Sequence, residues 1–493
     1  MYTFSSKLKT FSFILIFLGV LGIGYGFLTA PKNIEEVEKM LAANEHGGHH
    51  STTGHEAVEA NAHSKTASHN AAEVVTGAHA VAQVEKDTVT ADTTKIAATV
   101  DAPVETHKDV EHSKGVSEEN AHKEHQAHLE HVLHQLQNKP WSALYVACIF
   151  FMLITMGVLA FYAIQQVAQA GWSPVLFRVM QGITAYLPVG SVLFFILLLM
   201  AGFHFNHLFP WLDPEVVAHD KLIQNKAGYL NFPFWIVRAA IFLLGWNLYR
   251  FYSRKNCLAQ DESTDNSYYK KNFNISAMFL VFFIVTESIM SWDWIMSLDP
   301  HWFSTLFGWY VFASFFVSGI TTICMVTLYL KSVGYLEHVN TSHIHDLAKF
   351  MFGISVFWTY LWFSQFMLIW YANIPEEVTY FVQRIEDYNL PFFGAVVMNF
   401  VFPILILINT DFKRITWVLV MAGTVILLGH YIDFFNMIMP ATVGDQWFIG
   451  ASELGSISFF LGLFIFVVFS ALTKAPLLPK RNPYIEESKH FHY

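Results

Sequence analysis

Ten long apolar stretches constrain the fold of this chain more than any other feature of its sequence. Each is close to the length of about 20 residues that crosses a bilayer as a helix. They occupy residues 11–28, 142–165, 182–203, 232–252, 273–292, 303–330, 350–372, 392–409, 415–435 and 452–472. Helices are expected because, in hydrocarbon, backbone polar groups must be satisfied within their own segment. The sequence therefore predicts an all-α integral membrane protein with about ten transmembrane helices.

Charge and cysteine content exclude several classes of protein. Only 14% of the residues are charged and the formal net charge is -10, which argues against a nucleic-acid partner, because phosphate binding needs clustered Lys and Arg. The three cysteines, Cys148, Cys257 and Cys324, are far apart. They form neither the CxxCH of c-type haem nor the close spacing of an iron–sulfur site. We therefore expect no redox cofactor, and no catalytic residue, in this chain itself.

Positively charged residues predict the orientation in the membrane. With a cytoplasmic N-terminus, the short outer loops hold only Lys221, Lys226 and Arg384. Sixteen Lys and Arg residues then fall inside: Lys7, Lys9, Arg178, Arg250, Arg254, Lys255, Lys270, Lys271, Lys331, Lys349, Lys413, Arg414, Lys474, Lys480, Arg481 and Lys489. Cytoplasmic loops carry such an excess, so both termini are predicted to be cytoplasmic.

The first two segments differ sharply in composition. Residues 1–30 form an N-terminal transmembrane helix, which we expect to stay uncleaved because Pro31 disfavours cleavage near Ala30. Residues 31–140 hold 14 of the 24 histidines. This outer insert is expected to be largely disordered, since it has little apolar surface to bury, and to end in an amphipathic helix around 129–136. The weak metal candidates His122, His125 and His128 recur every third residue, and a solvated polar face is the alternative interpretation.

An internal repeat divides the remaining spans. Tyr, Pro and Phe open both the fourth and the eighth span, and an Asp precedes a Pro by seven residues at the end of the fifth and the ninth: Tyr229, Pro233, Phe234, Asp293 and Pro300, against Tyr388, Pro391, Phe392, Asp433 and Pro440. The paired motifs lie four spans apart, and an even number of spans gives both copies the same orientation in the membrane. The sequence therefore predicts two four-helix bundles, 141–302 and 303–440. The N-terminal helix and residues 441–493, the last span with its tail, would be peripheral. Chance remains the alternative, because Pro and aromatic residues often mark membrane interfaces.

Ionisable residues within the spans are the candidate functional groups, because each costs about 2.5–3.5 kcal/mol at the bilayer centre. The proton-transfer candidates are Arg238, Glu287, Asp293, His430, Asp433 and Glu453. By location, His204, His207 and Asp293 are the quinone-site candidates. All lie toward the outer side, and the inner halves are expected to be almost purely apolar. Arg238 and Glu287 are predicted to form an ion pair, and His430 and Asp433 to share one helix face. Mutual neutralisation is the alternative to proton handling.

Residues 293–305 (DWIMSLDPHWFST), followed by Phe307 and Gly308, resemble a stretch in the membrane subunits of bacterial alternative complex III. That complex is a quinol:cytochrome c, or quinol:oxidase, oxidoreductase of the respiratory chain. Its membrane subunits are similar to the polysulfide-reductase membrane anchor, the NrfD-like family. The ten spans and paired bundles agree with this resemblance, which is closest to the F-type subunit, although the His-rich insert departs from the family.

The resemblance implies a bacterial inner membrane, a periplasmic insert and a multisubunit complex. Haem c and iron–sulfur clusters would lie in partner subunits: a multihaem cytochrome c, an iron–sulfur protein, a homologous quinol-binding membrane subunit and, in the quinol:oxidase form, a terminal oxidase. This chain would contribute scaffold and a proton route or quinone surface for electron transport. Two other hypotheses stay open. One is a secondary transporter of a metal or proton-coupled solute, and the other is a non-catalytic assembly scaffold.

Overall fold

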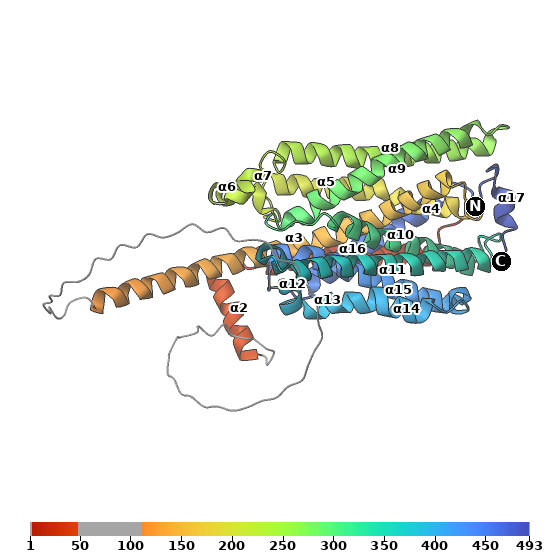
Figure 1. The fold of residues 1–493 in the computed structure, drawn as a ribbon. Coiled ribbons are helices and arrows are strands. Elements are labelled where there is room, and N and C mark those ends of the chain that lie inside the picture. The colour runs from red at the N-terminus through yellow and green to blue at the C-terminus, as the bar shows by residue number, and fades with distance from the viewer. Residues whose placement is uncertain (1, 48–109, 493) are drawn as a thin grey trace, which may run out of the picture. The chain divides into compact units, whose positions relative to one another are not determined.

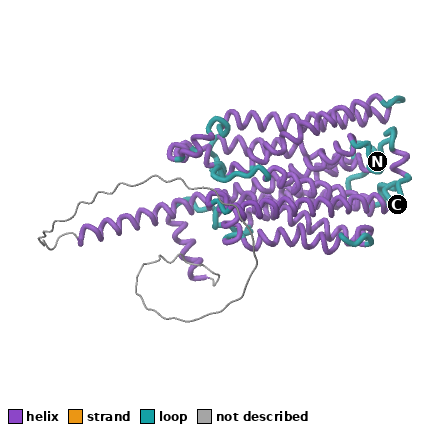
Figure 2. Tube along the Cα trace, viewed as in Figure 1, coloured by secondary structure: helices purple, strands orange, loops and turns teal. Residues whose placement is uncertain are grey.

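The computed structural model describes residues 2–47 and 110–492, and every regular element in these two ranges is a helix (Figures 1 and 2). Ten helical segments are long and apolar enough to cross a membrane. The predicted all-α, multi-pass membrane fold is therefore confirmed. The middle of the His-rich insert, which was predicted to be disordered, lies outside the described residues.

Most spans are longer than the apolar stretches that predicted them, because helical turns with polar residues extend them; the helix Phe307–Ser332 is shorter than its predicted stretch, 303–330. They are α1 (Ser6–Thr29), α3 (Val110–Val167), α4 with α5 (Phe177–Ile183, Leu187–Gly202), α8 (Phe232–Glu262), α9 (Ser267–Trp294), α10 (Phe307–Ser332), α11 (Thr341–Ala372), α13 with α14 (Asn389–Val396, Phe402–Leu407), α15 (Thr416–Val443) and α16 (Ala451–Leu472). The shorter α-helices are α2 (Ile34–Gly47), α6 (Pro214–His219), α7 (Lys221–Lys226), α12 (Pro375–Glu386) and α17 (Ile485–Lys489).

Residues 1–37 and 128–493 form one compact unit that contains all ten spans, and residues 38–127 form a second unit. Helix α3 belongs to both. It continues through Pro140 without a break, so the predicted amphipathic segment and the second span are a single helix. Leu129, Val132 and Leu136 are buried on the predicted apolar face.

Helices α3 and α10 form the centre of the membrane unit. They are the most buried spans, with 94% and 89% of their most apolar windows inside the protein, and they cross at two glycines. A Cβ atom on Gly157 would lie 2.5 Å from the carbonyl oxygen of Phe315, and one on Gly319 would lie 2.8 Å from the backbone nitrogen of Val158. Small residues let membrane helices approach this closely. Because α3 and α10 open the two predicted bundles, the halves of the unit meet through their first helices.

The other helices flank this centre on two sides (Figure 1). Helices α5, α8 and α9 lie along one side, and α11, α13, α14 and α15 lie along the other. Both termini and α17 lie at one end of the unit, here called the terminal end, and α6, α7 and α12 lie at the other, called the α12 end. The position of each buried side chain can therefore be described by its distance from the terminal end or from the α12 end.

Helices α1 and α16 pack against each other although they come from opposite ends of the sequence. Their contact is lined by small residues. A Cβ on Gly22 would lie 2.7 Å from the Cα of Gly455, and one on Gly26 would lie 2.7 Å from the Cβ of Ser452. This close packing gives the first helix a structural role in the folded unit.

Substitution of Gly22 by Leu is expected to separate α1 from α16, because the backbone of Gly455 leaves no room for a side chain. Gly24 on the same helix is the matched control, since a Cβ there meets nothing within 4 Å. We expect Gly22→Leu to lower the free energy of unfolding by about 1–3 kcal/mol, the usual cost of overpacking, and Gly24→Leu to change it little. Denaturant titration of the purified protein measures both, and equal effects would contradict the packing.

Candidate functional site

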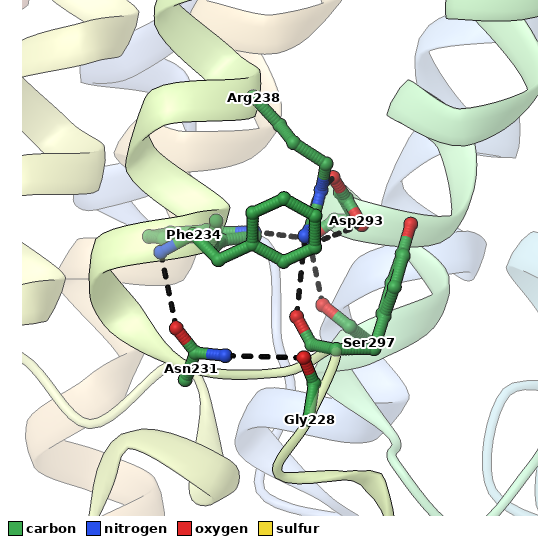
Figure 3. Close-up of polar contacts among 8 residues, drawn as sticks. Gly228, Asn231, Phe234, Arg238, Asp293 and Ser297 are labelled. Carbon is green, nitrogen blue, oxygen red and sulfur yellow. Dashed lines mark hydrogen bonds and ion pairs between the residues drawn. The ribbon is translucent and has the colours of Figure 1, made fainter.

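Asp293 of α9 is held by a buried ion pair with Arg238 of α8 (Figure 3). The guanidinium donates from Nε to Oδ2 at 2.7 Å and from Nη2 to Oδ1 at 3.0 Å. Trp235 also donates its indole N–H to the backbone oxygen of Asp293 at 2.9 Å. Asp293 is fully buried. We call these three residues the Asp293 cluster.

The start of α8 fixes the other side of the guanidinium. Asn231 caps the helix by accepting a hydrogen bond from the backbone N–H of Phe234 at 3.1 Å. The rings of Tyr229 and Phe234 then lie 3.9 and 4.3 Å from the Arg238 guanidinium carbon (Figure 3). Arg238 also donates to the carbonyl oxygen of Tyr229 at 3.2 Å. The ring contacts hold the Arg238 guanidinium in place, and its two hydrogen bonds hold the Asp293 carboxylate in one orientation.

Glu287 is not the partner of Arg238, contrary to the sequence prediction. It precedes Asp293 by six residues, which is about 240° around an α-helix, so the two carboxylates leave α9 in different directions. Glu287 is buried and accepts a hydrogen bond from the hydroxyl of Ser288 at 2.7 Å. Its Oε2 atom has no hydrogen-bond partner among the described residues. The sequence predicted an Arg238–Glu287 pair because the two residues lie at a similar depth in the membrane. The prediction was wrong because Glu287 lies on a different face of α9 from Asp293.

Asp433 of α15 occupies the corresponding place in the second bundle, with different partners. Tyr310 and Ser314 of α10 donate their hydroxyls to Oδ1 and Oδ2, and Trp358 of α11 donates its indole N–H to Oδ2 at 2.8 Å. His430 approaches from one turn earlier, with Nδ1 3.0 Å from the Ser314 hydroxyl and 3.7 Å from Asp433 Oδ2. We call these five buried residues the Asp433 cluster.

The donors in the Asp433 cluster are neutral, whereas Asp293 faces a permanent positive charge. Protonation of Asp293 would leave the Arg238 guanidinium buried without its counter-ion, so Asp293 is poorly placed to exchange a proton. The hydroxyl and indole groups around Asp433 carry no charge, and the imidazole of His430 lies 3.7 Å from its Oδ2 atom. The Nε2 atom of His430 is buried without a hydrogen-bond partner within the described ranges. Of the two sites, the Asp433 cluster is the better suited to proton transfer.

A small polar cavity adjoins the Asp433 cluster. Its volume of about 10 Å³ is close to the space of one water molecule. Tyr310, Gln365, Arg384 and Asn436 contribute to its lining. Gln365 Nε2 and Asn436 Oδ1 are buried and have no protein hydrogen-bond partner in the described part of the chain. A water molecule in this cavity could form hydrogen bonds with both unpaired atoms.

Arg384 lies between this cavity and the α12 end. The sequence placed it in an exposed loop, but α12 folds over the bundle and buries it. It donates to the carbonyl oxygens of Asn436 at 3.0 Å and Tyr380 at 2.8 Å, and its guanidinium lies 3.3 Å from the Tyr380 ring centroid. Burial lowers the pKa of Arg384, and neighbouring tyrosines and Asp299 partly oppose that shift. Tertiary packing therefore places a cation beside the small cavity, although Arg384 lies outside the predicted spans.

The α12 end also contains a polar cavity of about 600 Å³ shared by both bundles. We call it the α12-end cavity. Its ionisable lining residues are His131, His134, His207, Asp213, Glu215, Asp299 and His301. His207 lies 3.9 Å from Asp213, and His301 lies 2.5 Å from Asp220. Gln383 also lines the α12-end cavity, and its neighbour in the sequence, Arg384, lines the smaller cavity. The two cavities are therefore lined by adjacent residues of α12.

A second cavity at this end has a different character. It measures about 610 Å³ and is lined mainly by apolar and aromatic side chains, including Tyr229, Trp292, Trp302 and Phe303. Its polar groups come from Asn225, Lys226, Ser297, Asp299 and His301. We call it the aromatic pocket. Burial, followed by the charge of Asp293, raises the pKa of Tyr229, whose ring connects the pocket to the Asp293 cluster.

The remaining candidates from the sequence are dispersed. His204 is exposed at the end of α5 with a φ of 59°, and His207 is exposed in the α12-end cavity, so neither shares the buried environment of Asp293. Glu453 accepts from the backbone N–H of Gly450 at 2.8 Å and thereby caps α16. His122, His125 and His128 are exposed on α3. Among the described side chains, no group of three or more His, Cys, Asp or Glu residues could hold a metal ion.

A polar network surrounds Tyr162 near the terminal end of the first bundle. Four buried side chains lie within hydrogen-bonding distance of the Tyr162 hydroxyl, at 2.9–3.2 Å: Gln166, Gln181, Ser253 and Asn272. Arg178 also forms a 2.5 Å ion pair with Asp261. Apart from Tyr162, these six residues lie beyond the ends of the predicted spans, so the expectation of almost purely apolar inner halves stays a prediction.

No model of a known protein family matches this chain, and no curated protein sequence matches it.

Replacing Arg238 by Gln should destabilise the protein, because it leaves the Asp293 carboxylate buried without its counter-ion. The expected loss is about 3–5 kcal/mol of unfolding free energy. Adding Asp293→Asn should recover part of it, since the Gln and Asn amides are neutral and can hydrogen-bond to each other. Unfolding of the two single variants and the double variant tests this coupling. Additive losses would contradict a direct pair.

Proposed function

We propose that this chain is an integral membrane subunit of a respiratory quinol:cytochrome c or quinol:oxidase oxidoreductase in a bacterial inner membrane. Its part in the complex is to supply scaffold and to handle protons near the periplasmic face. The proposal rests on the resemblance of residues 293–305 and the following Phe307 and Gly308 to alternative complex III, of the F-type within the NrfD-like family. The α12 end would face the periplasm and both termini the cytoplasm, as the distribution of Lys and Arg favours.

The observation that carries the proton role is the contrast between Asp293 and Asp433. The two carboxylates end corresponding spans of the repeat, yet one is neutralised by Arg238 and the other is held by neutral donors and His430. Oxidation of a quinol releases protons as well as electrons, so a complex of this kind needs groups that accept them. We infer a route from Asp433 through Tyr310 and the small cavity, past Arg384, to the α12-end cavity.

Electrons would pass through partner subunits. Haem c would be carried by a multihaem cytochrome c, and iron–sulfur clusters by a separate protein. A homologous membrane subunit would bind quinol, and a terminal oxidase would complete the quinol:oxidase form. None of these redox groups is assigned to residues of this chain. Its surroundings would otherwise be membrane lipid.

A quinone surface on this chain is a second candidate, favoured by the aromatic pocket. Flat, apolar ligands fit pockets of about 300–1,000 Å³ that carry a few polar groups, and this one has Ser297, Lys226 and His301. Phe303, at its edge, is exposed. A quinone head group there would lie beside Tyr229 and near the Asp293 cluster. Asp293, a quinone-site candidate from the sequence, would then act on the quinone through Tyr229 and not by direct contact.

Two other functions make different predictions. A secondary transporter would move a metal or a proton-coupled solute when the chain is reconstituted alone. A pure scaffold would assemble with redox partners, but neutralising its buried carboxylates would leave their turnover unchanged.

Affinity purification from native membranes tests membership of the complex. We expect the chain to co-purify with haem-containing and iron–sulfur subunits, recognised by a visible haem spectrum and a subunit list. Recovery of the chain without redox partners, together with metal uptake by vesicles that contain it alone, would instead identify a transporter.

Asp433→Asn tests the proton role, because Asn keeps the shape of the side chain but cannot carry the proton. We expect assembly to persist and quinol-dependent turnover to fall about 10²-fold, the lower end for a positioned proton-transfer group. Glu287→Gln should also lower turnover. Asp411→Asn, at an exposed carboxylate outside the spans, is the control. Unchanged turnover in both buried-site variants would reject the proton role.

A further inference from the structure

A groove opens at the terminal end of α11, beside the connection between α3 and α4. It has a volume of about 350 Å³ and is lined by Trp172, Asp346, Lys349, Phe350, Gly353 and Ile354. We call it the Trp172 groove. The ring of Trp172 stacks on Phe350 with centroids 6.0 Å apart and an interplanar angle of 21°. A Cβ on Gly353 would meet nothing within 4 Å, so the apolar part of the groove is open at that point.

Positive charge gathers at the same end of α11. Lys349 pairs with Asp346 at 3.1 Å. The turn Phe412–Arg414 packs against α11 and adds Lys413 and Arg414. Lys413 Nζ lies 5.3 Å from the ring centroid of Phe352. Burial lowers the pKa of Lys413, and the nearby charge of Lys349 lowers it further. Three cations thus lie near the carboxylate of Asp346: Lys349 and Arg414 are exposed, and Lys413 is largely buried.

The groove changes from charged to apolar along the helix. Lys349 lies eight residues from the start of α11, about 12 Å along its axis. Phe350, Gly353 and Ile354 continue from it toward the middle of the span. A Trp beside Lys residues is typical of the boundary between lipid head groups and hydrocarbon. A ligand that fits this gradient needs an anionic head and an apolar tail.

We propose that the Trp172 groove binds an anionic phospholipid, with its phosphodiester near Lys349 and Lys413 and an acyl chain along Phe350 and Gly353. A cluster of cations at the end of membrane helices is a recognised setting for acidic lipid head groups. The lipid phosphate would relieve repulsion among the three cations. Its acyl chain would cover the open surface at Gly353, which a free phosphate ion cannot do.

Lipid binding to the full-length purified chain can be measured by native mass spectrometry. The probes are diphosphatidylglycerol and phosphatidylglycerol, with phosphatidylcholine as the zwitterionic lipid and inorganic phosphate as the free anion. We expect the anionic lipids to bind more tightly than phosphatidylcholine, and phosphate to compete poorly with them. Equal binding of all three lipids, or effective competition by phosphate alone, would overturn the proposal.

Charge and groove variants locate the site. Each cation near an anionic head group contributes about 1 kcal/mol, or about fivefold in affinity, so the double variant Lys349→Gln, Lys413→Gln should weaken binding about 25-fold. The double variant Lys270→Gln, Lys271→Gln removes two charges near the start of α9, also at the terminal end. It is the matched control and should change binding little. An equal loss in both would indicate general surface charge and overturn the assignment.

Gly353→Leu tests the acyl chain independently of charge. It fills the open position while leaving Lys349 and Lys413 in place, and we expect it to lower affinity for the anionic lipids several-fold. Gly394→Leu is the control, because a Cβ on Gly394 of α13 also meets nothing within 4 Å. Unchanged lipid affinity in Gly353→Leu would remove the acyl chain from the groove. Thermal unfolding in detergent confirms that each variant is folded.

Discussion

The close crossing of α3 and α10 is the contact on which the rest of the membrane unit depends. Gly157 and Gly319 bring the two backbones together where any side chain would collide with the opposite helix. Because lipid tails are as apolar as the helices, membrane helices associate through close packing rather than through the hydrophobic effect. The glycine crossing therefore makes a single core from two bundles, and residues of both halves line the α12-end cavity.

Two related bundles give corresponding residues different chemistry. In the first bundle, Arg238 fixes the charge of Asp293 and turns the carboxylate into part of the framework. In the second, Asp433 receives hydrogen bonds from three neutral donors, and His430 lies nearby. Under the proposed function, the first bundle would give support and the second would exchange protons.

The two ends of the unit differ in the same physical terms. At the α12 end, histidines and carboxylates line a cavity that is accessible to water, and buried Arg384 lies near it. At the terminal end, Lys349, Lys413 and Arg414 lie near a groove with both charged and apolar lining residues. Polar groups also surround Tyr162 near this end of the first bundle. Both ends of the membrane unit therefore carry polar groups.

The sequence by itself determined the fold class, the number of spans and the identity of most buried charges. These follow from local rules, since an apolar stretch of about 20 residues in lipid has to form a helix and a charge within it stands out. Tertiary structure alone decided the partners. Asp293 takes Arg238 because Glu287 leaves α9 on another face, and Arg384 becomes buried because α12 folds over the bundle. Tyr310 and Ser314 from α10 and Trp358 from α11 meet at Asp433 of α15, and neutral residues carry no sequence signal for such a meeting. Packing between segments far apart in the chain decides which helix faces touch. A pattern along the sequence does not show how close two such segments lie in space.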